Sequence, residues 1–187
     1  LPERFIGQLR RGQSILVNGD FEAGTFTGWT LVGNTISNNM IYNAVQSSSS
    51  FQQAVRSGTY GAFLGDLLLA TLSQAVATVP GQSYLLSLWL DNSVSSGTQI
   101  FLVRWNTNSP AVNTIYSLTN PPVFTWTNLQ FLVTAAGTDT VLQFAAQNGD
   151  NFFGMDDVTL TPIPEMKFQS ASKSADAINL AWTAATG

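Results

Sequence analysis

Short segments in which apolar and polar residues alternate follow one another through most of this chain of 187 residues. In residues 84–91 the even-numbered positions are Tyr or Leu, whereas the odd-numbered positions include Ser87, Trp89 and Asp91. The same alternation recurs in residues 101–105, 129–134, 141–146 and 153–161. A period of two with one polar face is typical of half-buried antiparallel strands. The alternation therefore predicts β-structure and disfavours amphipathic helices.

Turn sequences separate these segments at intervals of about ten residues. They are Asn18-Gly19-Asp20, Pro80-Gly81, Ser96-Gly97, Asn120-Pro121-Pro122 and Asn148-Gly149-Asp150. Many short strands with such turns indicate an all-β fold, an antiparallel β-sandwich of the jelly-roll kind. We expect this domain to span residues 14–162, after an N-terminal arm or linker at residues 1–13. Trp29 and Trp105 are expected in its core.

Residues 163–187 form a separate region, and the stiff Pro162-Ile163-Pro164 sequence marks the break between it and the domain. Two strand-like runs follow, at residues 166–171 and 177–182. About twenty residues are too few to form a domain alone. This region is therefore either the beginning of a second, truncated β-sandwich domain or a pair of strands that add to another partner.

The composition excludes several classes of function. The chain contains no Cys and no His, so it has no disulfides, no ordinary zinc site and no Ser-His-Asp or Cys-His nucleophile. A net charge of −4 with seven scattered Lys and Arg residues argues against nucleic-acid binding. No apolar run is long enough for membrane insertion. The low charge favours an extracellular or cell-surface location.

Catalysis by two carboxylates is also not expected. A glycosidase places two acids across a cleft, whereas Asp156 and Asp157 are adjacent in a strand and point to opposite faces. The other aspartates fall mainly at strand ends and turns. The sequence therefore predicts that this is not an enzyme.

Motifs at the two ends of the predicted domain carry a resemblance. Residues 16–24 (LVNGDFEAG) with Gly28-Trp29 at one end, and residues 153–161 (FGMDDVTLT) at the other, resemble the galactose-binding-domain-like carbohydrate-binding modules of bacterial secreted proteins. The resemblance implies a β-sandwich jelly roll that binds a polysaccharide or other glycan. Residues 166–187 resemble the opening of a fibronectin-type-III-like domain.

The same resemblance implies a structural calcium ion that joins the first and last strands. Its carboxylate ligands would be Glu22 and either Asp156 or Asp157, with carbonyl groups near residues 56–59 completing the shell. If Met155 packs inward, strand alternation turns Asp156 to solvent and Asp157 to the interior. We therefore predict Glu22 and Asp157 as the metal ligands. The alternative is that both acids accept hydrogen bonds from turn amides without a metal.

A candidate glycan site lies on the predicted outward face of the central strands. Sugar rings stack on exposed aromatic side chains while polar groups hold their hydroxyls. Trp89, Arg104 and Gln130 all have outward parity, and we predict that they lie on neighbouring strands and bind carbohydrate. The competing interpretation is that Trp89 packs under a loop.

Two functions follow from these patterns. The first is a non-catalytic extracellular carbohydrate-binding module of a larger secreted or cell-surface bacterial protein. The second is a structural subunit of an extracellular filament or adhesive layer, which self-assembles when its terminal strands add to an exposed sheet edge of a neighbour.

Overall fold

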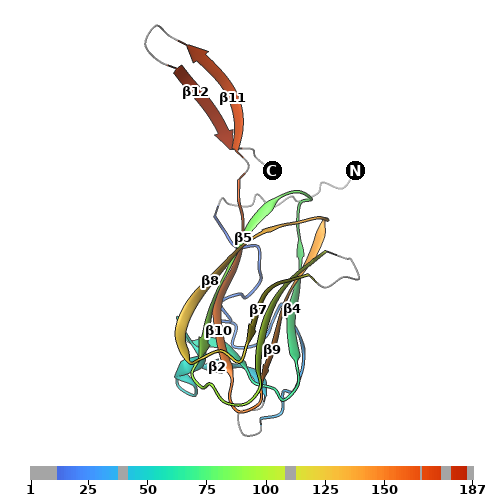
Figure 1. Ribbon diagram of the computed structural model, residues 1–187, viewed down its shortest axis with the longest axis vertical. Helices are drawn as coiled ribbons and strands as arrows, with labels where there is room; N and C mark the ends of the chain where they lie inside the picture. The colour runs from blue at the N-terminus through green and yellow to red at the C-terminus, as the bar shows by residue number, and fades with distance from the viewer. Residues whose placement is uncertain (1–11, 38–41, 108–112, 165, 174–177, 185–187) are drawn as a thin grey trace.

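The computed structural model describes residues 12–37, 42–107, 113–164, 166–173 and 178–184. Two five-stranded antiparallel sheets pack face to face, which confirms the predicted β-sandwich (Figure 1). Sheet A has the order β1-β4-β9-β6-β7, with β1 (Thr30–Val32), β4 (Ala70–Ala77), β9 (Asp139–Asn148), β6 (Gln99–Thr107) and β7 (Thr114–Thr119). Sheet B has the order β2-β3-β10-β5-β8, with β2 (Asn43–Ser47), β3 (Tyr60–Leu64), β10 (Phe153–Pro162), β5 (Ser83–Asn92) and β8 (Phe124–Thr134).

The main core fills the space between the sheets. The even-numbered leucines of β5 are fully buried there, and Phe101 of β6 stacks on Phe144 of β9 with ring centroids 6.1 Å apart. Trp29 and Trp105 both belong to this core, as the sequence predicted. The alternation holds because each strand exposes successive side chains to opposite faces of its sheet.

A second, smaller apolar cluster lies on the outer face of sheet B. The loop between β2 and β3, which contains the short 3-10 helix η1 (Gln52–Ala54), covers this face. Phe63 and Phe152 stack there with ring centroids 3.9 Å apart, and Phe51 of the loop packs against both.

Two glycines let the loop lie directly on the strands. A Cβ atom at Gly61 would lie 2.0 Å from the carbonyl oxygen of Ala54, and one at Gly154 would lie 2.4 Å from that of Gln53. Neither contact is possible for a residue with a side chain. Sheet B therefore has one face in the main core and much of the other face under a loop.

The segment before β1 runs antiparallel to the end of β10. Ile15 N–H donates to the carbonyl of Leu160, and Val158 N–H donates to that of Gly19. The hydroxyl of Ser14 accepts the N–H of Leu160 at 3.1 Å. The first and last described segments of the sandwich consequently lie side by side. The predicted arm at residues 1–13 falls almost entirely outside the described residues.

The two strand-like runs of the C-terminal region pair with each other. They form β11 (Met166–Lys173) and β12 (Ile178–Ala184), a hairpin with one register shift between Phe168 and Ser170. This hairpin extends away from the sandwich (Figure 1). Ile178 and Leu180 are exposed on it. In the part of the chain that the structure describes, no helix has the length and apolar character to cross a membrane.

Candidate functional site

Residues 56–60, which comprise the end of the β2–β3 loop and the first residue of β3, bring the acids of the two end motifs together. The Oε1 atom of Glu22 accepts the backbone N–H groups of Thr59 at 2.8 Å and Tyr60 at 2.9 Å. Gly58 has a φ of +66°, and a Cβ atom there would lie 2.3 Å from Glu22 Oε1. Glycine is thus required at position 58 by both the backbone conformation and the closeness of the carboxylate.

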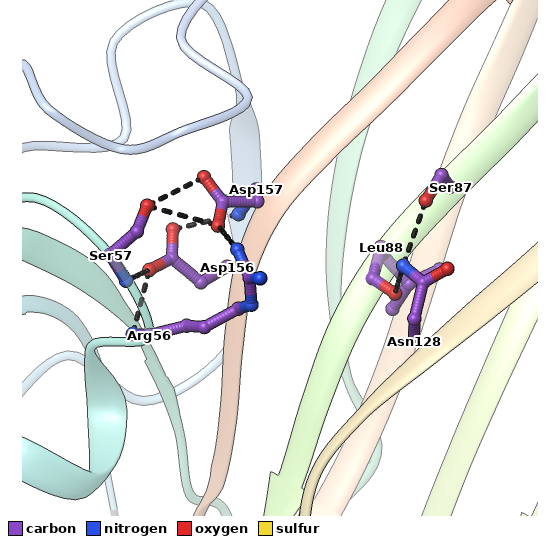
Figure 2. A network of polar contacts seen from close by, with 7 residues as sticks. All are labelled: Arg56, Ser57, Ser87, Leu88, Asn128, Asp156 and Asp157. Atoms are coloured by element: carbon purple, nitrogen blue, oxygen red, sulfur yellow. Dashed lines mark hydrogen bonds and ion pairs between the residues drawn. The ribbon is translucent and has the colours of Figure 1, made fainter.

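Asp156 anchors the same loop from the other side. It is fully buried, and its Oδ2 atom accepts the N–H groups of Arg56 at 2.8 Å and Ser57 at 3.1 Å. Its Oδ1 atom accepts the N–H of Asp157 at 2.7 Å. Burial raises the pKa of Asp156 to about 6, against the opposing effect of the three amide hydrogen bonds. Figure 2 shows the hydrogen bonds that Asp156 accepts from Arg56 and Ser57.

The predicted orientation of this Asp pair is wrong. Asp156 is the buried residue, and Asp157 is partly exposed, with 23% of its side chain accessible. Strand alternation does turn Asp156 away from the main core, but the β2–β3 loop covers it there. The pairing of β10 with β5 then shifts register between Asp156 and Thr159, and Asp157 has a φ of 49°. This irregularity releases Asp157 from the alternation.

Asp157 forms an ion pair in place of the predicted interior contact. Its Oδ2 atom lies 2.6 Å from Nη1 of Arg56, and Ser57 Oγ lies 3.0 Å from both of its carboxylate oxygens (Figure 2). Among the described residues, no three acidic side chains gather as a metal-binding cluster. The acids of the resemblance thus converge on one loop, where amide and guanidinium donors already occupy much of their hydrogen-bonding capacity.

Trp89 lies beside this loop on the outer face of sheet B. In the strand register it stands between Asp156 of β10 and Asn128 of β8. The guanidinium carbon of Arg56 lies 3.7 Å from the centroid of the Trp89 ring, in a cation–π contact. The half-buried Trp89 therefore presents its covered ring face to Arg56, which Asp157 holds in place.

Polar side chains continue the surface along β8. Asn128 Nδ2 donates to Ser87 Oγ at 2.9 Å and to the carbonyl of Leu88 at 3.1 Å (Figure 2). Gln130 stands opposite Ser87 in the register and is exposed. The structure thus confirms that Trp89 and Gln130 share one outer face.

Arg104, the third predicted member, lies elsewhere. It belongs to β6 in sheet A, where its Nη1 atom donates to Gln143 Oε1 at 2.9 Å. Outward parity was assigned correctly, since Val103 and Trp105 on either side are buried in the core. However, the chain crosses from one sheet to the other between β5 and β6, so these successive strands do not pair. The predicted grouping of Arg104 with Trp89 is therefore wrong.

The sequence interpretation missed Trp126, which completes the surface. It precedes Asn128 by two residues on β8, and its Cη2 atom would lie 3.0 Å from a Cβ atom at Gly154. Trp126 is half-buried. Its even numbering, shared with Asn128 and Gln130, was a readable signal that it faces outward. We define the Trp89–Trp126 surface as residues Arg56, Trp89, Trp126, Asn128 and Gln130.

Asp91 is a second buried carboxylate near this surface. It follows Trp89 by two residues, stands opposite Gly154 in the register and is 6% exposed. Its Oδ2 atom is buried and makes no hydrogen bond. Burial raises the pKa of Asp91 to about 6. Asp91 and Asp156 are both enclosed by protein, so they do not form the open pair of acids that glycoside hydrolysis uses.

No protein-family model matches the chain, and no curated protein matches it in sequence. Solved structures do match its fold. A family 61 carbohydrate-binding module, solved in complex with β-1,4-galactotriose, is 17% identical and covers 81% of this chain and 100% of its own, with a TM-score of 0.62. A xylan-binding CBM22-1 domain from Paenibacillus barcinonensis Xyn10C is 14% identical and covers 83% and 98%, with a TM-score of 0.58.

A family 16 carbohydrate-binding module is 23% identical and covers 79% of this chain and 99% of its own, with a TM-score of 0.54. At these identities the likeness establishes the fold. The chain therefore folds as the β-sandwich that carbohydrate-binding modules adopt, as the resemblance of its end motifs implied.

Proposed function

We propose that this chain is a non-catalytic carbohydrate-binding module of a larger extracellular or cell-surface bacterial protein, and that the Trp89–Trp126 surface holds its glycan. The observation that carries this proposal is the juxtaposition of two half-buried tryptophans with two amide side chains on one sheet face. Its support from the comparisons is the shared fold of modules that bind galactotriose and xylan.

The two outer faces of the sandwich differ in what they offer a sugar. On sheet A the outward positions of the central strands carry small, aliphatic or polar side chains, which include Thr71, Ser73, Ala75, Leu102, Arg104, Gln143 and Ala145. These positions supply no aromatic ring for stacking. Sheet B supplies two, and this difference favours the Trp89–Trp126 surface as the binding site.

Each group of that surface has a distinct role in the proposal. Trp126 stacks against the apolar face of a sugar ring. Arg56, held flat on Trp89 and paired with Asp157, directs its remaining N–H groups to sugar hydroxyls. The exposed amide of Gln130 supplies both a donor and an acceptor for hydroxyl groups on the neighbouring sugar.

Affinity electrophoresis against a panel of soluble polysaccharides, followed by calorimetry on any that bind, tests the proposal. Trp126→Ala should weaken binding by about tenfold to a hundredfold, the range of a dominant contact residue. Arg104→Ala, on the opposite sheet, is the matched control and should bind like the wild type. If the wild type binds no polysaccharide, the proposed carbohydrate-binding function is refuted. If the Trp126→Ala variant binds normally, the Trp89–Trp126 surface is refuted as the binding site.

A structural calcium ion between Glu22 and the Asp156–Asp157 pair belongs to the same proposal. Both sides of the residue 56–60 loop present carboxylates, and Glu22 Oε2 makes no hydrogen bond within the described part of the chain. Calcium should then raise the melting temperature of the wild type and leave Glu22→Gln unchanged, because Gln keeps the amide-accepting oxygen but loses the charge. An equal response of the two proteins would rule the ion out.

The projecting hairpin favours a second candidate function, a filament or adhesive-layer subunit assembled through terminal strands. A lone two-stranded hairpin is at best marginally stable in water, and Ile178 and Leu180 of this one are exposed. Electron microscopy of the wild type and of a chain lacking residues 166–187 tests this candidate. Filaments that persist without the hairpin would exclude this mode of assembly.

A further inference from the structure

At the β8 edge of sheet B, none of the strands that the structure describes lies beyond β8. β8 is the last strand in the order β2-β3-β10-β5-β8 and pairs only with β5 among the described strands. In Figure 1 it is the gold strand at the left side of the sandwich. Eleven residues long, it is longer than the other edge strands, which have three (β1), five (β2) and six (β7) residues.

β8 lacks the usual protection of an exposed edge. Soluble proteins block such edges with charged residues, prolines or short strands. Residues 105–138, which include both β7 and β8, contain no charged residue, and the two prolines at 121 and 122 precede β8. A register shift opposite Leu90–Asn92 falls within residues 124–127, the first four residues of the strand. On its side away from β5, the rest of the strand pairs with no other described strand. At its end the carbonyl of Thr134 accepts the indole N–H of Trp105 at 2.9 Å.

The sequence of β8 is complementary to itself in the antiparallel direction. Residues of a pair share a face only if their numbers add to an even value, and the two-fold register that uses the whole strand is centred on Leu129. In this register Asn128 meets Gln130, whose amide N–H can donate to Asn128 Oδ1, and Trp126 meets Leu132. Leu132 is 69% exposed in the single chain.

We propose that two copies of this chain associate through antiparallel β8–β8 pairing, which joins the two B sheets into one ten-stranded sheet. The partner is a second copy because the edge is uncharged, so that no like charges oppose each other across the axis. A two-fold arrangement also closes on itself, so it produces a dimer and leaves no free β8 edge.

Sedimentation over a range of about 1 µM to 1 mM tests the association. The wild type should reach the mass of two chains of 20.1 kDa. Leu132→Lys places a charge on the edge strand, as soluble proteins do to block pairing, and should weaken dimerisation at least tenfold. Leu68→Lys replaces an equally exposed leucine in a loop and should dimerise normally. A wild type that stays monomeric, open-ended oligomers, or equal behaviour of the two variants would overturn the proposal.

Cysteine cross-linking tests the register, and the native chain contains no cysteine to interfere. Leu129→Cys places two thiols opposite each other at the axis, within the Cα separation that a disulfide spans. Leu132→Cys is the control, because its two thiols would be about 20 Å apart along the strands. Random collision would favour the more exposed Leu132→Cys, so preferential cross-linking there refutes the register. Because Leu132 faces Trp126 of the other copy in this register, polysaccharide binding of the wild type is measured at concentrations at which it is monomeric, and this separates the proposal from the proposed function.

Discussion

Sheets A and B enclose one core, but their outer faces are built differently. The outer face of sheet A carries small or aliphatic side chains and one Arg–Gln hydrogen bond. The outer face of sheet B carries a covering loop, a second apolar cluster and two buried carboxylates whose pKa values are raised. On sheet B, the buried carboxylates and the covering loop lie where two glycines and the register shift between Asp156 and Thr159 interrupt the sheet. The register shift of sheet A, between Val103 and Arg104, has no such loop over it in the described part of the chain.

The largest expected effect comes from removing the glycine under the covering loop. Gly61→Val places a side chain against the backbone of Ala54, and backbone atoms cannot move away as a flexible side chain can. We expect the free energy of unfolding to fall by about 3 kcal/mol or more. Chemical denaturation measures this loss. Ala75→Val on the exposed face of sheet A is the control, and a similar loss there would erase the contrast between the faces.

The Asp156–Asp157 pair gives the next largest effect. Asp156→Ala leaves three backbone N–H groups without an acceptor in a buried site, which should cost about 2–4 kcal/mol. Asp157→Ala removes a partly exposed ion pair and should cost about 1 kcal/mol or less. Equal losses in urea denaturation would show that the loop does not depend on the buried carboxylate.

The raised pKa values of Asp91 and Asp156 predict an unusual pH dependence. Each carboxyl binds its proton more tightly in the folded chain than in the unfolded chain. Burying the ionised carboxylate lowers the free energy of unfolding. This loss of stability is fully present above pH 6 and disappears as the pH falls toward 4. Between pH 7 and pH 5 each group should add roughly 1 kcal/mol to the free energy of unfolding.

Asp91→Asn isolates one of these contributions, because the asparagine side chain does not titrate. The variant should show about half of the wild-type gain between pH 7 and pH 5 in denaturation experiments. If the free energy of unfolding of both proteins instead decreases as the pH is lowered from 7 to 5, the assignment of raised pKa values to the buried carboxyls is contradicted.

The smallest expected effect concerns the two arginines on opposite faces. Arg56→Ala removes a cation–π contact and a partly exposed ion pair, and should lower the free energy of unfolding by about 1 kcal/mol. Arg104→Ala removes a single hydrogen bond to Gln143 and should cost about 0.5–1 kcal/mol. The two variants should differ more in glycan affinity than in stability. Arg56→Ala should weaken binding and Arg104→Ala should not, since only Arg56 belongs to the Trp89–Trp126 surface.

The sequence alone predicted which side chains are buried and which face outward wherever this depends on a single strand. The inward parity of Leu88, the burial of Trp105, and the outward parity of Trp89 and Gln130 all follow from a period of two. The burial of Trp29 was expected from its place after a turn glycine in the resembling motif. The sequence was insufficient where distant segments meet. The sheet to which Arg104 belongs depends on where the chain crosses the sandwich, and no local pattern marks that crossing.

The Asp156–Asp157 pair illustrates a second limit. Alternation gave the correct direction for Asp156, but its burial comes from a loop about one hundred residues away in the chain. Asp157 departs from the alternation through a positive φ that no turn sequence announces. Trp126, in contrast, is predictable from its parity, because it shares the even numbering of the outward-facing Asn128 and Gln130.

The antiparallel contact between residues 14–19 and the end of β10 has a mechanical consequence. Because these segments run in opposite directions, the chain enters and leaves the sandwich at the same end. A tension applied between the two ends would load these hydrogen bonds one after another, as in opening a zipper, and would not shear them together. A module with this geometry yields at low force, so in a protein under tension it would extend before neighbours whose end strands must slide past each other.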